Sequence, residues 1–208
     1  MRIKLLLGMV LCSLPAFSQC ASATRFWVGG GSSTAFNATG NTNWATSSGG
    51  SNNASVPTTG TVWCADANSG SGTINITANT SSLGAGDTTN FTGTLQWGSG
   101  IFLEMEGNLI IGASVTISIG STASKIEWNG SAGTYTLTEL GTQTLPLIEV
   151  NSSGTTLELG SAITTQQLDC LAGTFNSENY AITVNSTPGV LSSGSSACTA
   201  TLGSSTVT

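Results

Sequence analysis

Four acidic residues recur along the chain at a nearly constant interval. Glu104, Glu127, Glu149 and Asp169 follow one another at 23, 22 and 20 residues, and each stands between two apolar residues. If these residues stack on successive coils, carboxylates recur about every 4.8 Å along one face. Carboxylates that close repel each other, and their oxygens are the ligands that Ca²⁺ prefers. The spacing predicts a cation-binding acidic stripe, with an offset, hydrated stripe that needs no metal as the alternative.

A second pair of carboxylates suggests a hydrolytic alternative. Glu104 and Glu106 are two residues apart, so in a strand they share one face at roughly 6.5–7 Å. That separation suits an inverting glycosidase, and the neighbouring Phe102 could stack on a sugar ring. A lyase would also need a base near the substrate carboxylate, and only Arg25 and Lys125 remain outside the first turn of the sequence. Two solvated outer-face acids are the simpler interpretation.

The residue types that most often carry catalysis are missing. The sequence has no histidine, which excludes Ser-His-Asp and Cys-His catalysis and removes the commonest metal ligand. Its cysteines show no Cys-x-x-Cys spacing, so a zinc site is not expected. We therefore predict no catalytic residue and no cofactor apart from Ca²⁺ at the acidic stripe, and a protein that is not an enzyme.

The elements that must position these residues are short strands. From Thr61 onward apolar and polar residues alternate in runs of three to five, broken by Gly, Ser and Asn, and no helical period competes. A second polar series has intervals of 20 to 23 residues, and it comprises Asn75, Gln96, Thr116, Thr136, Glu158 and Ala181. Two ladders with one period predict an all-β parallel β-solenoid (β-helix) with coils of about 20–23 residues and two or three strands each. An antiparallel β-sandwich or jelly roll is the alternative.

The same alternation predicts the core and the domain boundaries. The residues expected to point inward are Ile101, Leu103, Met105, Ile117, Ile119, Ile126, Trp128, Leu137, Ile148, Val150, Leu157, Leu159, Leu168, Ile182 and Val184. Residues 24–60 do not follow the ladder and contain Trp27, Phe36 and Trp44, so they are expected to cap the open end. Residues 61–208 form the predicted solenoid domain, which we expect to be truncated because no cap is recognisable at its C-terminal end.

The first 23 residues resemble an export signal. Arg2 and Lys4 precede an apolar stretch that is too short to span a bilayer, and Ala21-Ser22-Ala23 is an A-x-A cleavage motif. Cleavage after Ala23 is predicted, with lipoprotein processing at Cys20 as the alternative. The remaining chain is secreted or held at the cell surface, has no membrane span, and carries two basic residues against ten acidic ones. Such a surface repels nucleic acid.

Three cysteines remain after the predicted cleavage. Cys170 and Cys198 are separated by about one coil, which makes them the expected disulfide partners in an exported protein. The alternative is that Cys64, Cys170 and Cys198 are all buried free thiols.

Several motifs, in order, resemble a known group of proteins. They are Phe26-Trp27-Val28-Gly29-Gly30, Asn43-Trp44, Ala54-Ser55-Val56-Pro57-Thr58, Asp66-Ala67-Asn68-Ser69, Thr142-Gln143-Thr144-Leu145-Pro146, Glu149-Val150-Asn151-Ser152-Ser153-Gly154, Ala172-Gly173-Thr174-Phe175 and Leu202-Gly203-Ser204-Ser205-Thr206. The group comprises repeat-rich proteins of environmental tailed phages and bacteria. The resemblance implies a β-solenoid in a surface or tail-associated structural protein, and it brings no catalytic motif.

These observations lead to two functional expectations. The first is a secreted structural or adhesive module that contacts glycans or neighbouring protein chains, and that could form oligomers. The second is a polysaccharide lyase or glycoside hydrolase that uses outer-face carboxylates.

Overall fold

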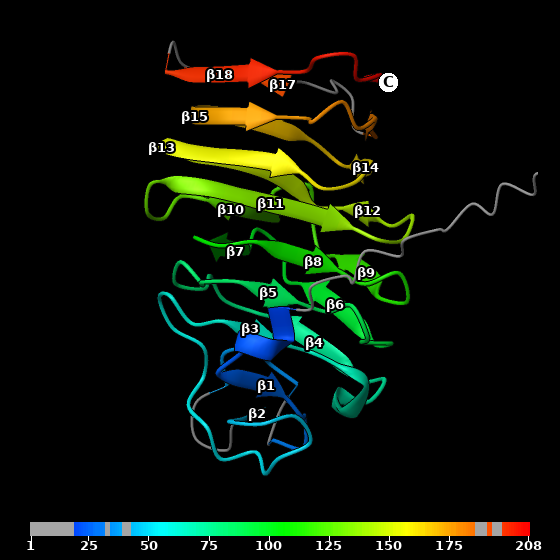
Figure 1. The fold of residues 1–208 in the computed structure, drawn as a ribbon. Helices are drawn as coiled ribbons and strands as arrows, with labels where there is room; N and C mark the ends of the chain where they lie inside the picture. The colour runs from blue at the N-terminus through cyan, green and yellow to red at the C-terminus, as the bar shows by residue number, and fades with distance from the viewer. Residues whose placement is uncertain (1–18, 32–33, 39–42, 186–190, 193–196) are drawn as a thin grey trace, which may run out of the picture.

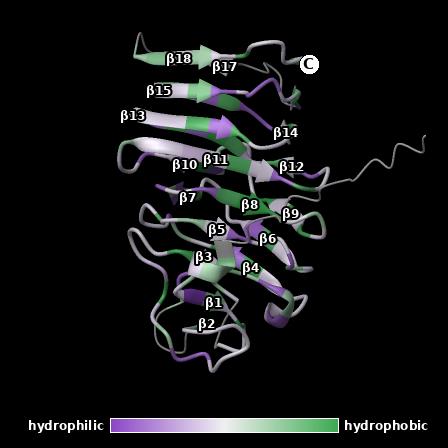
Figure 2. Cartoon of the chain, in the orientation of Figure 1, coloured by the Kyte–Doolittle hydropathy of each residue, from purple (hydrophilic) through white to green (hydrophobic). Residues whose placement is uncertain are grey.

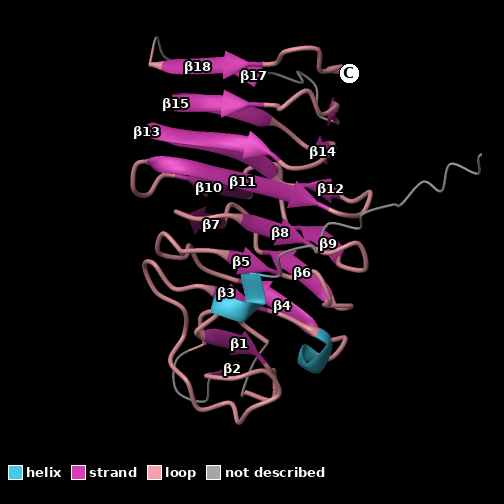
Figure 3. Ribbon diagram, viewed as in Figure 1, coloured by secondary structure: helices cyan, strands magenta, loops and turns pink. Residues whose placement is uncertain are grey.

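The chain folds into a stack of parallel strands. The computed structural model describes residues 19–31, 34–38, 43–185, 191–192 and 197–208. Its strands form a β-solenoid of about six turns, which rises from the N-terminal cap to the C-terminal strands (Figure 1). Helix is confined, in this part of the chain, to two short turns near the N-terminal end, η1 (Gln19–Ser22) and η2 (Ala67–Ser69) (Figure 3). The predicted fold class is confirmed, and the antiparallel alternative is wrong.

Each turn contributes up to three strands, which stack in three columns. We call the first the ladder column, and it contains β7 (Phe102–Met105), β10 (Lys125–Trp128), the start of β13 (Leu147–Leu159), the start of β15 (Leu168–Asn176) and β17 (Leu191–Ser192). The second contains β1 (Arg25–Trp27), β3 (Trp63–Cys64), β5 (Gly86–Asp87), β8 (Leu109–Ile111), β11 (Gly133–Glu139), the ends of β13 and β15, and β18 (Cys198–Thr201). The third contains β4 (Thr73–Ile76), β6 (Thr94–Trp97) and β9 (Thr116–Ile119), followed by β12 (Thr144–Leu145), β14 (Ile163–Thr165) and β16 (Ile182–Val184).

The first predicted ladder stacks residue on residue. Glu127 on β10 is in register with Glu104 on β7 and with Glu149 on β13, and Glu149 is in register with Asp169 on β15. The four carboxylates therefore stand on successive coils of one column, as their spacing predicted.

The second predicted ladder is only partly correct. Asn75 does pair with Gln96, but Gln96 pairs next with Ser118 instead of Thr116. Thr136 and Glu158 are in register with each other in a different column. Coils differ in length and the three columns share one alternation pattern, so equal spacing alone could not assign these residues to a column.

The next strand partner confirms that the later part of that ladder was wrong. Glu158 pairs with Asn176 on β15, and Ala181 lies in the connection that leads to β16.

Apolar residues fill the space between the columns. Of the predicted core, eleven residues are buried, and they are Leu103, Met105, Ile126, Trp128, Leu137, Ile148, Val150, Leu157, Leu159, Leu168 and Ile182. Ile101, Ile117 and Val184 are partly buried against this core. Burial alternates along strands such as β4, and hydrophobic and hydrophilic residues are interspersed along the strands (Figure 2). Each buried aliphatic or aromatic side chain contributes about 1.5–3 kcal/mol to stability.

An aromatic cluster lies beneath the first coil. β1 pairs parallel with β3, and β2 (Trp44–Ala45) pairs antiparallel with the other edge of β1. Trp27, Phe36, Trp44 and Trp63 pack edge to face with ring centroids 4.8–6.3 Å apart. The Trp44 indole N–H donates to the Phe36 carbonyl at 2.7 Å. Such contacts stabilise the cluster beyond the area that they bury, and β2 covers an edge that would otherwise be open to other strands.

Successive coils come into backbone contact at a column of glycines. A methyl group at Gly107 would lie 1.7 Å from the carbonyl oxygen of Gly84, and one at Gly84 would lie 2.5 Å from the carbonyl oxygen of Gly60. No side chain larger than hydrogen fits between these coils.

Two disulfides fasten the stack. Cys170 on β15 is bonded to Cys198 on β18, with Cα atoms 5.7 Å apart, so the pair that the sequence favoured joins consecutive coils. Cys64 is bonded to Cys20, with Cα atoms 5.3 Å apart. The alternative of three free cysteines is therefore wrong, because it overlooked a partner within the segment assigned to the signal.

Candidate functional site

The acidic stripe, defined as Glu104, Glu127, Glu149 and Asp169, is buried over most of its length. Only 5, 6 and 9% of Glu127, Glu149 and Asp169 is exposed, while Glu104 is partly buried. The expectation of an offset, hydrated stripe is wrong on both points. Carboxylates this far from water need hydrogen-bond or charge partners within the protein.

Lys125 supplies the positive charge of the stripe. It lies two residues before Glu127 on β10, so the two side chains project from the same face of the strand. Its Nζ is 3.0 Å from Glu127 Oε2 and 2.5 Å from Glu149 Oε1. It also lies 4.1 Å from the ring centroid of Phe102, its register partner on β7. One ammonium thus bridges two coils and rests on an aromatic ring of a third.

Side-chain amides bind the remaining carboxylate oxygens. Asn129 donates to Glu104 Oε2 at 3.1 Å, and Asn151 donates to Glu127 Oε1 at 2.9 Å. In both cases the amide comes from the next coil, two residues after that coil's own glutamate. This Glu-x-Asn repeat was visible in the sequence, but the sequence interpretation did not use it.

The last carboxylate of the stripe has an amide partner as well. Gln167 Nε2 lies 2.9 Å from each carboxylate oxygen of Asp169. Each of the four acids is thus bound by at least one amide or ammonium group of the chain itself.

Burial and pairing shift the pKa values of this network in opposite senses. Burial alone would lower the pKa of Lys125, but its hydrogen bonds and charge attraction to Glu149 and Glu127 raise that pKa above its ordinary value. Burial raises the pKa of Glu149, and the attraction of Lys125 only partly offsets this. The ammonium therefore stays charged through neutral pH, while the Glu149 carboxylate bears a desolvation cost.

This arrangement answers the calcium hypothesis with a different cation. Within the described residues, no group of three or more Asp, Glu, Cys or His side chains could hold a metal ion. Lys125 lies between the two central glutamates of the stripe, where the sequence interpretation expected a metal. Phe102 lies under the same ammonium, so its ring is not a free platform for a sugar.

The proposed catalytic pair is also engaged with neighbouring side chains. Glu104 and Glu106 are both partly buried, and both alternate with the buried Leu103 and Met105. Glu104 accepts from Asn129, and the hydroxyl of Ser131 donates to Glu106 Oε2 at 3.2 Å.

Glu139 is a buried acid that the sequence did not single out. It ends β11, is 4% exposed, and its Oε1 accepts the backbone N–H of Gly141 at 2.8 Å. Burial raises its pKa, and the backbone N–H donors of Gly141 and Gln143 only partly oppose the shift. It borders a small cavity of about 170 Å³, together with Thr142 and Thr164.

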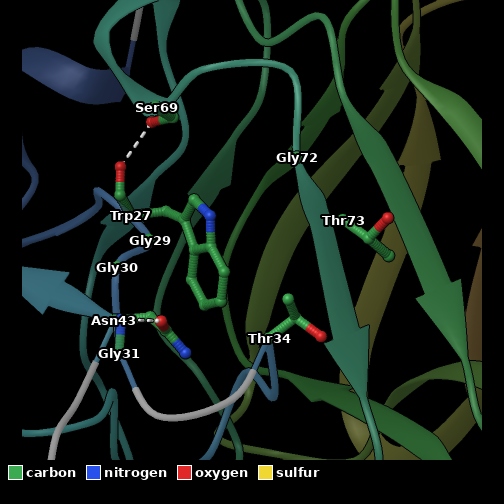
Figure 4. A pocket seen from close by; sticks show the side chains of 9 residues that line it. All are labelled: Trp27, Gly29, Gly30, Gly31, Thr34, Asn43, Ser69, Gly72 and Thr73. Carbon is green, nitrogen blue, oxygen red and sulfur yellow. Dashed lines mark hydrogen bonds between the residues drawn. The ribbon is translucent and has the colours of Figure 1, made fainter.

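A larger cavity of about 360 Å³ opens beside the aromatic cluster, and we call it the cap pocket (Figure 4). It is lined by Trp27, Gly29, Gly30, Gly31, Thr34, Asn43, Ser69, Gly72 and Thr73, none of which carries a charge. Ser69 donates to the Trp27 carbonyl at 2.5 Å, and Asn43 Oδ1 accepts from the Gly31 N–H at 2.8 Å. Trp27 is only 2% exposed, so the pocket offers polar groups and backbone edges instead of an open aromatic face.

Comparison with known proteins finds no matching family model, no matching curated protein and no matching solved structure. Among the described residues, no helix has the length and apolar character needed to cross a membrane. The fold and the geometry of these sites are therefore the basis for assigning a function.

Proposed function

We propose that the protein is an exported structural or adhesive β-solenoid, part of a bacterial surface or a phage tail-associated assembly, whose cap pocket binds a neutral glycan. The observation that carries this proposal is the combination of a disulfide-fastened stack with an uncharged, polar pocket at its capped end.

The acidic stripe supports a structural role. Lys125, Asn129, Asn151 and Gln167 saturate its carboxylates across successive coils. A network of this kind binds coil to coil and leaves few groups for reaction with a substrate.

The lining of the cap pocket supports a neutral, hydroxyl-rich ligand. Small sites are usually concave and contain a few polar groups that fix the orientation of the ligand. Here the hydroxyls of Thr34 and Thr73 and the backbone of Gly29 and Gly30 surround the space, and no charge is present to bind an acidic sugar.

A glycan array probed with the purified protein, together with sedimentation to detect assembly, tests the proposal. Thr73→Phe places a ring in the pocket and should abolish retention of the neutral glycan. Thr94→Phe is the matched control, because Thr94 is the register partner of Thr73 on the next coil and does not line the pocket. Absence of any glycan binding together with a purely monomeric protein would overturn the proposal.

Polysaccharide cleavage by Glu104 and Glu106 is the competing function. It has less support because Lys125 is held by Glu127 and Glu149 and is not free to bind a substrate carboxylate. Release of reducing ends from polysaccharides by the wild type, lost in Glu104→Gln, would favour cleavage over adhesion.

A further inference from the structure

Cys20 is an integrated part of the folded domain. Its sulfur is bonded to Cys64 on β3, and its backbone N–H donates to Asp87 Oδ2 on β5 at 3.3 Å. The turn that carries it, η1, packs against both strands. Two residues on, Thr24 donates its N–H to the Val62 carbonyl at 2.9 Å, so the chain continues from η1 into the first coil.

Cleavage after Ala23 would remove this part of the fold. Cys64 is fully buried and would be left as an unpaired thiol, and the buried Asp87 would lose the hydrogen bond from Cys20. Acylation of the Cys20 sulfur, as in a lipoprotein, would prevent the same disulfide because one sulfur cannot carry both bonds.

A second cleavage motif lies upstream. Ala16-Phe17-Ser18 has small residues at the two positions that A-x-A-like signals require, and it follows the apolar stretch more closely than Ala21-Ser22-Ala23 does. Hydrolysis after Ser18 would leave Gln19 as the first residue and keep Cys20.

We propose that the export signal is removed between Ser18 and Gln19, and that the Cys20–Cys64 disulfide then fastens the new N-terminus to the first coils of the solenoid. Water cleaves the Ser18–Gln19 peptide bond, which yields a carboxylate on Ser18 and an amine on Gln19. The two thiols lose two protons and two electrons to a disulfide-donating oxidoreductase of the export compartment. The inference rests on the proposed export, and it does not depend on glycan binding.

The test is to express the full chain with export to a bacterial periplasm and to map the purified protein by mass spectrometry without reduction. We expect an N-terminal peptide that begins at Gln19, as glutamine or in its cyclised form, joined to the peptide that contains Cys64. A chain that begins at Thr24 with a free Cys64 thiol, or a lipid on Cys20, would overturn this inference and leave export intact. A full-length chain retained in the cytoplasm would overturn both export and cleavage.

Two matched variants sharpen the result. Ser18→Leu replaces the small residue at the proposed site and should block cleavage or move it to another position. Ala23→Leu alters the downstream motif in the same way and should leave the N-terminus at Gln19. The reverse pattern, with cleavage sensitive to Ala23→Leu alone, would contradict the proposal.

Discussion

Lys125 lies between two glutamates of successive coils, 3.0 Å from Glu127 and 2.5 Å from Glu149. The two carboxylates are in register on β10 and β13, so the ammonium is shared by neighbours that would otherwise repel each other. A stack of identical coils would bring like charges together at every turn. This chain avoids that by placing a cation or an amide from an adjacent coil beside each acid.

Replacing Lys125 should destabilise the solenoid. Lys125→Met leaves two buried carboxylates without their cation, and breaking a buried ion pair in this way costs about 3 kcal/mol. We expect the midpoint of thermal unfolding to fall by about 6–12 °C, as measured by circular dichroism. The loss should grow from acid to neutral pH, because the burial that raises the pKa of Glu149 then acts unopposed by Lys125.

The matched control for this variant neutralises the acids as well. In Lys125→Met with Glu127→Gln and Glu149→Gln, no charge is buried without a partner, so most of the lost stability should return. If the triple variant is no more stable than Lys125→Met, the ion pairs are not the cause. In the wild type, the contribution of Lys125 is complete at neutral pH and is lost only as pH rises past its raised pKa, above 10.5.

Glu139 should make the protein more stable at mildly acidic pH than at neutral pH. Burial raises its pKa above 4.5, so within that interval the folded state binds more protons than the unfolded state, and stability falls as pH rises. Glu139→Gln retains an oxygen that can accept from the Gly141 N–H, but it has no proton to lose. Urea unfolding from pH 3 to pH 7 should show a smaller decline for the variant. The two proteins should agree at pH 3 and differ at pH 7, and parallel curves across the range would contradict this.

The sequence predicted the fold because its strongest signal is the one that stacking requires. Each acid of the stripe stands between two residues that point into the core, and the coils that carry them have nearly equal lengths. Register therefore followed directly for Glu104, Glu127 and Glu149. It failed for Thr116 and Ala181, because three columns with the same alternation cannot be told apart by spacing.

The character of the site was less predictable. Charged residues are usually solvated, and that rule concealed the burial of the stripe. The informative signal was the neighbourhood of each acid, namely Lys125 two residues before Glu127 and Asn129 two residues after it. The Cys20–Cys64 bond was missed because the segment that contains Cys20 was set aside as a signal.

Calcium should not alter the stability of the solenoid. Lys125 already compensates the charge of Glu127 and Glu149, and the amides of Asn129 and Asn151 bind further oxygens of the stripe. A divalent ion would have to displace these groups and then repel the ammonium. We expect the unfolding temperature to be the same in calcium and in a chelator. A rise with calcium would revive the metal hypothesis, and loss of that rise in Glu127→Gln would locate the ion.

The glycine column predicts how closely the coils must approach. Gly107→Ala puts a methyl group 1.7 Å from the backbone oxygen of Gly84, which cannot rotate away as a side chain would. The coils would have to separate, at a cost of about 3 kcal/mol, near the upper end for an overpacked site. Gly72→Ala is the matched control, since a methyl group there meets nothing within 4 Å and the backbone is not in the left-handed region. That variant should unfold at the same denaturant concentration as the wild type or a slightly higher one, because alanine lowers the entropy of the unfolded chain. Equal effects of the two substitutions would mean that stability reflects glycine content in general, and that these coils do not depend on backbone contact.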